Sequence, residues 1–427
     1  MRRPIVSPLV LLLVVAACSS SPERRPLPPL DVADAAAAPS APELSDLTGR
    51  LVVLDGTGNL TVMRPDGTER VILAKSDAER RMLSHPTWSP DGRQVAWTEL
   101  GLDDRASLVV APSDGSEASR TEVPFPSVYM AWDPRSEQIA FVGRDVEDGS
   151  LGMVTVAPSA GVINHIDSGA PFYLDWAPTG EGLAIHVANR LAVVLPDGGD
   201  RVNIPSSGSF RVPTFVGDTL IHAIDTESGP ILVTSTGDAE PVEIARFGGT
   251  LAYTVHPDGE RVAALATGPP GFDGDRHERA GTEAPDLSPN ELTLIDLSTG
   301  SQSIVDDRRA VVWHWSPNGD RLLFGTFEQQ RSHLTEYPIR WHMWDGTSTT
   351  DLGIFVPSAL LASQYLPFFD QFERSMSVWS PDGSAFVYAG RGEDREAAVW
   401  VQRTDVEAGP SRQGPGVFAA WAPSPEG

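Results

Sequence analysis

The sequence predicts an all-β fold, a β-propeller built from four-stranded blades. Three observations carry this prediction. A phrase of a large apolar residue, a Ser-Pro-Asp-Gly-like turn and an apolar pair occurs eight times, clearest at 88–97. The phrases recur every 39–64 residues, and most intervals lie near the 40–45 residues of a propeller blade. The flanking residues are alternating, β-branched or aromatic, as half-buried strands require.

Each phrase is predicted to be two strands joined by a tight turn. Proline presets φ, aspartate bonds its own backbone, and glycine takes the positive φ that ends the turn. The residue before each turn serves as the anchor of its unit. The eight anchors are Trp88, Trp132, Trp176, Phe215, Val255, Trp315, Trp379 and Trp421. The turn after Phe215 is worn, so eight blades are expected, with seven as the alternative.

The two ends of the predicted propeller domain, residues 48–427, are expected to share one blade. Strands are predicted at 51–54, 60–63 and 70–73 with no anchored strand before them, whereas the anchored strand 418–421 has no strand after it. Pairing of the last strand inside the first three would remove the exposed edges of the ring.

The N-terminal residues predict a lipoprotein leader over residues 1–17. Two arginines precede an apolar run that is too short to span a bilayer, and Val15-Ala16-Ala17-Cys18 follows. This run resembles the lipobox of bacterial lipoproteins, which implies cleavage before Cys18 and attachment of lipid there, with palmitate as an acyl group. An ordinary secretory signal is the alternative. Residues 18–47 are rich in Ser, Pro and Ala and are expected to form a flexible tether.

The net charge and the cysteine content exclude several classes of ligand and site. The formal net charge is −26, which argues against nucleic acid and anionic lipid headgroups as ligands. Cys18 is the only cysteine, so an intrachain disulfide and a cysteine-based metal cluster are excluded. No cofactor is expected. The expected location is the bacterial cell envelope, outside the cytoplasm, with the membrane contacted through the lipid on Cys18.

The WSPDG phrase followed by an apolar strand, as in Gln94-Val95-Ala96-Trp97 and Arg321-Leu322-Leu323-Phe324, resembles the repeat of TolB-like β-propellers. The resemblance covers the chain from Gly49 onward. It implies the fold and says little about activity, because the family includes the periplasmic TolB protein, propeller domains of prolyl-oligopeptidase-type peptidases, and lipoproteins. The peptidases keep their nucleophile in a separate hydrolase domain, and no G-x-S-x-G, H-E-x-x-H, P-loop or G-x-G-x-x-G motif occurs in the sequence.

Three insertions, at 268–290, 328–336 and 356–375, are predicted on one face of the ring, because B–C and D–A connections emerge together in a four-stranded meander. The last insertion is apolar. It is either a buried plug packed on the ring or an exposed patch that docks a partner. The candidate residues of a partner-binding face are Phe272, Tyr365, Phe368, Phe369 and Phe372.

The functional expectation is a non-enzymatic binding or scaffold module for an envelope protein or a polysaccharide, acting through its loop-rich face. The alternative is a carbohydrate-active propeller enzyme of the lyase type that uses channel-facing histidine and acidic residues. That alternative requires His85 or His314 to lie close to other titratable groups at one channel mouth. A third reading, a spacer in an envelope complex, requires segment 360–372 to be wholly buried.

Overall fold

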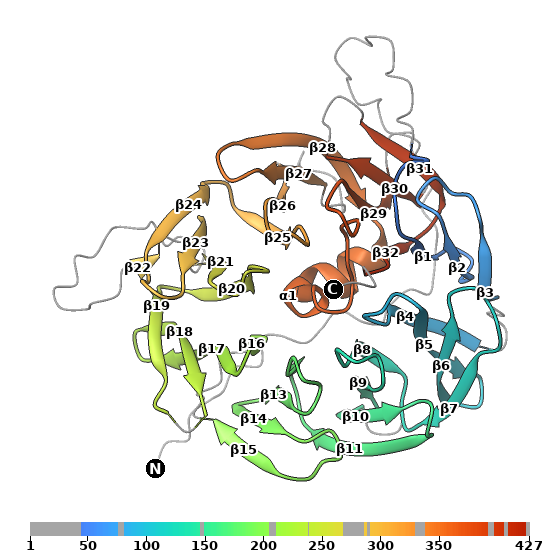
Figure 1. The fold of residues 1–427 in the computed structure, drawn as a ribbon, viewed down its shortest axis with the longest axis horizontal. Helices are drawn as coiled ribbons and strands as arrows, with labels where there is room; N and C mark the ends of the chain where they lie inside the picture. The colour runs from blue at the N-terminus through green and yellow to red at the C-terminus, as the bar shows by residue number, and fades with distance from the viewer. Residues whose placement is uncertain are drawn as a thin grey trace, which may run out of the picture. The chain divides into compact units, whose positions relative to one another are not determined.

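A computed structural model describes residues 44–75, 81–145, 149–204, 211–237, 239–267, 286–287, 291–328, 338–391, 397–404 and 409–423. The chain divides into two units, Met1–Ala38 and Pro39–Gly427, and all described residues belong to the second. The sheets of this second unit follow one another around a ring, as a β-propeller requires, with strands such as β4, β8 and β25 toward the centre (Figure 1).

The first and last strands of this unit form one sheet, in the order β3-β2-β1-β32. Its strands are β1 (Leu51–Leu54), β2 (Leu60–Met63), β3 (Val71–Ala74) and β32 (Phe418–Trp421). β1 and β32 are antiparallel and pair from Leu51↔Trp421 to Leu54↔Phe418. The predicted closure, with the C-terminal strand innermost and the three N-terminal strands outside it, is confirmed.

Three regular four-stranded antiparallel sheets follow along the chain. Their strands are β4 (Arg81–Trp88), β5 (Gln94–Gly101), β6 (Ala106–Pro112) and β7 (Ser119–Val123); β8 (Ser127–Trp132), β9 (Ile139–Arg144), β10 (Leu151–Ala157) and β11 (Val162–Ser168); β12 (Phe172–Trp176), β13 (Leu183–Val187), β14 (Arg190–Val194) and β15 (Arg201–Ile204).

The remaining described strands continue the same pattern, with one addition: β22 (Asp286–Leu287) pairs in parallel with the outer strand β19. They are β16 (Thr214–Val216), β17 (Thr219–Thr226), β18 (Gly229–Thr236) and β19 (Val242–Phe247); β20 (Thr250–Val255), β21 (Arg261–Thr267), β23 (Leu292–Asp296) and β24 (Gln302–Asp306); β25 (Ala310–Trp315), β26 (Leu322–Phe327), β27 (Ile339–Trp344) and β28 (Thr349–Pro357); β29 (Ala385–Arg391), β30 (Ala397–Arg403) and β31 (Pro410–Pro415).

The described strands form seven hydrogen-bonded sheets but eight successive antiparallel units. The difference arises because β28 and β29 pair briefly, at Val356↔Arg391 and Pro357↔Gly390, and so join two units into one seven-stranded sheet. The inner position of the last unit is held by Trp379, which forms an isolated bridge to Phe386 in β29. The worn repeat at Phe215 is a complete unit, β16–β19.

The turn after each anchor forms as its residues dictate. After Trp88, the Gly92 amide donates to the Ser89 carbonyl (2.9 Å), and the Ser89 hydroxyl donates to the Asp91 carboxylate (2.6 Å). Gly92 has a φ of +65° and lies so near the Pro423 carbonyl that a Cβ there would sit 2.9 Å from its oxygen. Glycine is therefore required at this position for both conformation and space.

The anchor tryptophans also connect neighbouring units. The indole Nε1 groups of Trp88, Trp176 and Trp379 donate to carbonyl oxygens of the adjacent inner strands, at Ala420 (3.3 Å), Ala131 (3.1 Å) and His314 (3.1 Å) respectively. The Nε1 groups of Trp132 and Trp315 are buried and have no hydrogen-bond partner among the residues that the structure describes. A large indole at the end of an inner strand thus fills the space between two units and, in three cases, bonds them.

Candidate functional site

The centre of the ring is occupied by residues 358–376, hereafter the central segment. It contains the π-helix η1 (Leu361–Tyr365), the 3-10 helix η2 (Leu366–Phe368) and the helix α1 (Phe369–Phe372). Figure 1 shows α1 inside the ring of strands. The described residues contain no helix that could span a bilayer, since the longest of these has five residues where about 20 are needed.

Polar and aromatic contacts tie the central segment to the inner strands of several units. Gln371 bonds the Leu174 backbone in β12 twice, its Oε1 accepting from the amide and its Nε2 donating to the carbonyl (both 2.9 Å). The Tyr129 hydroxyl in β8 donates to the Gln371 carbonyl (3.1 Å). On the other side, the Phe369 ring lies 4.5 Å from that of Trp313 in β25. The segment is therefore a plug held by specific contacts.

The aromatic residues predicted as a partner-binding face do not lie together on a surface. Tyr365, Phe369 and Phe372 are 3%, 7% and 5% exposed, whereas Phe368 is 44% exposed. Phe272 lies outside the described residues. Of the two alternatives for this insertion, the buried plug describes Tyr365, Phe369 and Phe372, and the exposed patch is wrong for these three. Their i, i+4, i+7 spacing places them on one helical face, toward the inner strands, and this spacing is a signal that could have identified them.

His85 and His314 both pack against the central segment, each against different aromatic rings. The His85 ring stacks on Phe372 at 6.4 Å, and the His314 ring lies 6.4 Å from Phe369. Burial lowers the pKa of each to about 4, so both rings are neutral at physiological pH. For His314 burial is the only cause of the shift. Within the described ranges, no three His, Cys, Asp or Glu side chains gather in a way that could hold a metal ion.

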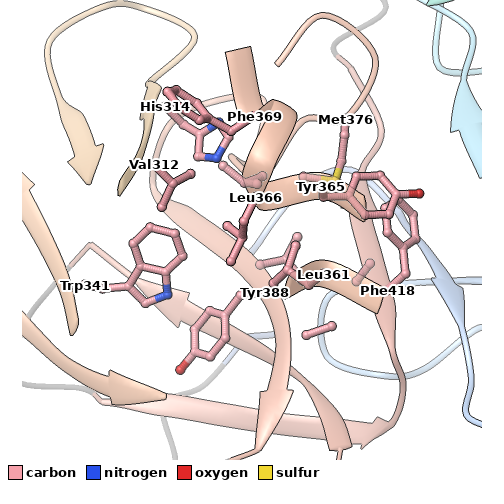
Figure 2. A pocket seen from close by; sticks show the side chains of 14 residues that line it. Val312, His314, Trp341, Leu361, Tyr365, Leu366, Phe369, Met376, Tyr388 and Phe418 are labelled. Atoms are coloured by element: carbon pink, nitrogen blue, oxygen red, sulfur yellow. The ribbon is translucent and has the colours of Figure 1, made fainter. Parts of the chain in front are cut away.

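A small cavity of about 20 Å³ remains between the central segment and the neighbouring strands (Figure 2). Its wall is almost entirely apolar and includes Val312, Trp341, Tyr388 and Phe418, with the His314 ring at one side. This volume is about enough for one water molecule. It is a packing void beside the segment and too small for a ligand.

A much larger cavity of about 470 Å³ is lined by Glu373 and Arg374 of the central segment. We call it the basin. Three consecutive inner strands, β16, β20 and β25, end in its wall, and the turns after them and residues following α1 contribute the rest. The lining residues are Phe215, Val216, Gly217, Val255, His256, Pro257, Asp258, Gly259, Trp315, Ser316, Pro317, Glu373, Arg374, Ser377 and Trp379.

Glu373 and Arg374 bring charge into the basin. The Trp315 amide donates weakly to Glu373 Oε1, at 3.4 Å, and Arg374 Nε lies 4.0 Å from Asp175 Oδ1 in β12. No hydrogen bond joins the Arg374 guanidinium to any residue that the structure describes, and 37% of its side chain is exposed. The guanidinium is thus oriented by charge while its N–H groups stay available.

Burial perturbs the carboxyl groups beside Arg374. It raises the pKa of Glu373 to about 7, even though the Arg374 charge acts in the opposite direction. Burial likewise raises the pKa of Asp175, against the Arg374 charge and the Phe215 amide, which donates to Asp175 Oδ2 at 2.8 Å. Burial acts to lower the pKa of Arg374, but the carboxylates of Asp175 and Glu373 outweigh it and raise that pKa overall.

Asp258 and His256, which also line the basin, already have hydrogen-bond partners. Arg261 bonds the Asp258 carboxylate at 2.6 Å, and His256 Nε2 lies 2.8 Å from the Gly319 carbonyl. The basin therefore offers a ligand one hydrogen-bond donor fork, Arg374, beside one carboxyl group with a near-neutral pKa, Glu373. Sequence reasoning did not identify these two residues, because the aromatic residues of the same insertion dominated its pattern.

Comparison with known proteins shows the fold. No protein-family model and no curated protein matches the chain. Among solved structures, a eukaryotic initiation factor matches with a TM-score of 0.54 at 13% identity, over 89% of this chain and 100% of that one. A structure from a study of two prolyl endopeptidases matches with a TM-score of 0.52 at 10% identity, over 82% of this chain but 51% of that one. TolB from Acinetobacter baumannii matches with a TM-score of 0.39 at 15% identity, over 74% of this chain and 65% of that one, a likeness too weak to carry an argument.

Proposed function

We propose that the chain is a binding module held outside the cytoplasm by a lipid on Cys18, and that it takes its ligand in the basin. The observation that carries this proposal is a cavity of about 470 Å³ with a guanidinium on its wall that makes no hydrogen bond to a described residue. Small-ligand sites are concave, about 300–1,000 Å³ in volume, and have a few polar groups set among apolar walls. The basin is concave and has a volume in this range, and its wall carries both polar and apolar side chains.

The proposed location rests on the N-terminal sequence. The apolar leader, the Val15-Ala16-Ala17-Cys18 run and the Ser-, Pro- and Ala-rich stretch that follows are what a lipoprotein with a flexible tether would carry. The proposed ligand is accordingly a component of the cell envelope, either a protein or a polysaccharide.

The basin is preferred to the loop-rich face because of where the central segment lies. Three of its aromatic residues face inward, so the apolar insertion offers far less surface to a partner than its composition indicates. Of the five candidate residues, Phe368 is the exposed one among those described. Because the other three are buried, the loop-rich face lacks their aromatic side chains, and aromatic side chains supply much of the binding energy at most protein interfaces.

A photo-crosslinking amino acid at two positions in living cells tests this function. A crosslinker at Val216, in the basin wall, should capture an envelope component, and one at Phe368 should not. Capture should fall strongly in a Cys18→Ala background, in which the chain should also leave the membrane fraction. Capture at Phe368 alone would return the binding site to the loop-rich face, and capture that is independent of Cys18 would refute the anchor.

One observation favours a second candidate, a carbohydrate-active enzyme. A carboxyl group with a pKa of about 7 in a cavity has the property required of a general acid or base, and Glu373 has it. The two histidines offered for that role are buried against aromatic rings instead. An enzyme would convert a bound glycan, and Glu373→Gln would abolish the conversion while leaving binding measurable.

A further inference from the structure

The basin wall combines a donor and an acceptor in adjacent residues. Arg374 carries five N–H groups in a fixed fork. Among the described residues, one hydrogen bond reaches the Glu373 carboxyl group, the weak one of 3.4 Å to Oε1. A hydroxyl group both donates and accepts, so two hydroxyls on neighbouring carbons can bond such a fork and such a carboxylate together.

Charged groups of both signs already lie beside one another in and around the basin before any ligand arrives. Arg374 lies next to Asp175, at 4.0 Å, and follows Glu373, while Asp258 is paired with Arg261. An oxyanion on Arg374 would approach the carboxyl groups of Asp175 and Glu373, and the formal net charge of −26 adds to that repulsion. A cation would approach the guanidinium. A neutral ligand meets neither penalty.

The rest of the wall suits the carbon skeleton of such a ligand. Phe215, Val216 and Val255 are half-buried and line the basin, and Pro257 is exposed at its edge. These apolar surfaces can cover the C–H faces of a sugar ring while its hydroxyls bond Glu373 and Arg374.

We propose that the basin binds a neutral, hydroxyl-rich ligand, the end of an uncharged oligosaccharide, through paired hydrogen bonds to Glu373 and Arg374. This inference rests on the proposed function, because it names the ligand class of the same site. It does not depend on whether the bound sugar is afterwards cleaved.

Calorimetric titration of the full chain, with Cys18→Ala to keep it free of lipid, tests the ligand class. The neutral probes are maltotriose, cellotriose, mannotriose and chitotriose, and the anionic probes are citrate, inorganic phosphate and trigalacturonate. At least one neutral trisaccharide should bind. Arg374→Met should weaken that binding about tenfold or more, since it removes hydrogen bonds from a charged donor. Arg93→Met is the matched control, because Arg93 is an exposed turn residue that does not line the basin.

Each of the other outcomes contradicts either the ligand class or the binding site. Binding of anionic probes alone, lost in Arg374→Met, would overturn the ligand class and leave the basin as the binding site. Neutral binding that survives Arg374→Met would remove the site from the basin and overturn both proposals. If no probe binds while a crosslinker at Val216 still captures an envelope component, the ligand class is wrong and the function stands. Matching thermal unfolding of all variants is required, so that misfolding is not read as lost binding.

Discussion

At the scale of single residues, carboxyl groups at the ring centre make stability depend on pH. Burial raises the pKa of Glu373 to about 7, from an ordinary value of 4.5, and raises those of Asp175 and Asp370 as well. A group whose pKa is higher in the folded than in the unfolded state binds more protons when folded. Its contribution therefore makes the fold less stable as pH rises through the interval between the two values.

Glu373→Gln should remove this contribution. Relative to wild type, the variant should gain unfolding free energy between pH 5 and pH 8, by up to about 3 kcal/mol, since each pKa unit corresponds to about 1.4 kcal/mol. Urea unfolding of both proteins at pH 5, 6, 7 and 8 measures the difference. Glu181→Gln, at an exposed position, should give a difference that does not vary with pH. A flat difference for Glu373→Gln too would show that its carboxyl titrates normally.

At the scale of elements, the sequence predicted that the central segment is an apolar insertion but did not predict whether it is buried or exposed. Its apolar content predicted either a plug or a docking patch, and Tyr365, Phe369 and Phe372 are buried as in a plug. The sequence could not decide between the two because apolar residues are favourable in both settings. Glu373 and Arg374 could not be recognised as site residues from the sequence. The strands that form the basin around them, β16, β20 and β25, lie far apart in the sequence and come together only in the folded ring.

Two adjacent residues of the segment test its role as a plug. Phe369→Ala should cost about 3–5 kcal/mol of unfolding free energy, because it leaves a hole against Trp313 next to the small cavity. Phe368→Ala should change stability by about 0.5 kcal/mol, since its ring is 44% exposed. Urea denaturation of both variants gives the comparison directly. Equal losses would mean that the segment does not pack against β25 as a fixed element.

At the scale of the whole molecule, repeat arithmetic predicted most of the architecture. Eight anchors correspond to eight successive units, and unmatched strands at the two ends correspond to the β1–β32 pair. The number of sheets could not be read from the sequence, because the pairing of Val356 and Pro357 with β29 joins two units through backbone bonds alone. The surroundings of the histidines could not be predicted from the sequence either. The ring that stacks on His85, that of Phe372, lies more than 200 residues away in the sequence.

The ring of this unit is closed without a covalent bond, so a disulfide across β1 and β32 should stabilise it. Val53 and Ala419 are register partners, both 5% exposed, and the bond from the Ala422 amide to the Arg50 carbonyl (2.8 Å) marks their position as a non-hydrogen-bonded pair. Cα atoms approach most closely at such pairs, which suits a disulfide. In a Cys18→Ala background, Val53→Cys with Ala419→Cys can form this bond alone.

The oxidised protein should exceed its reduced form by about 2–5 kcal/mol in unfolding free energy, because the bond closes most of the chain into one loop in the unfolded state. Guanidinium unfolding with and without reductant measures this on a single sample, so that the packing effects of the two substitutions cancel. If the disulfide forms in the folded protein, β1 and β32 meet as described. If the disulfide forms but the unfolding free energy does not change, the ring must unfold while β1 and β32 stay paired. Pairing of these two strands would then contribute nothing to the stability of the propeller.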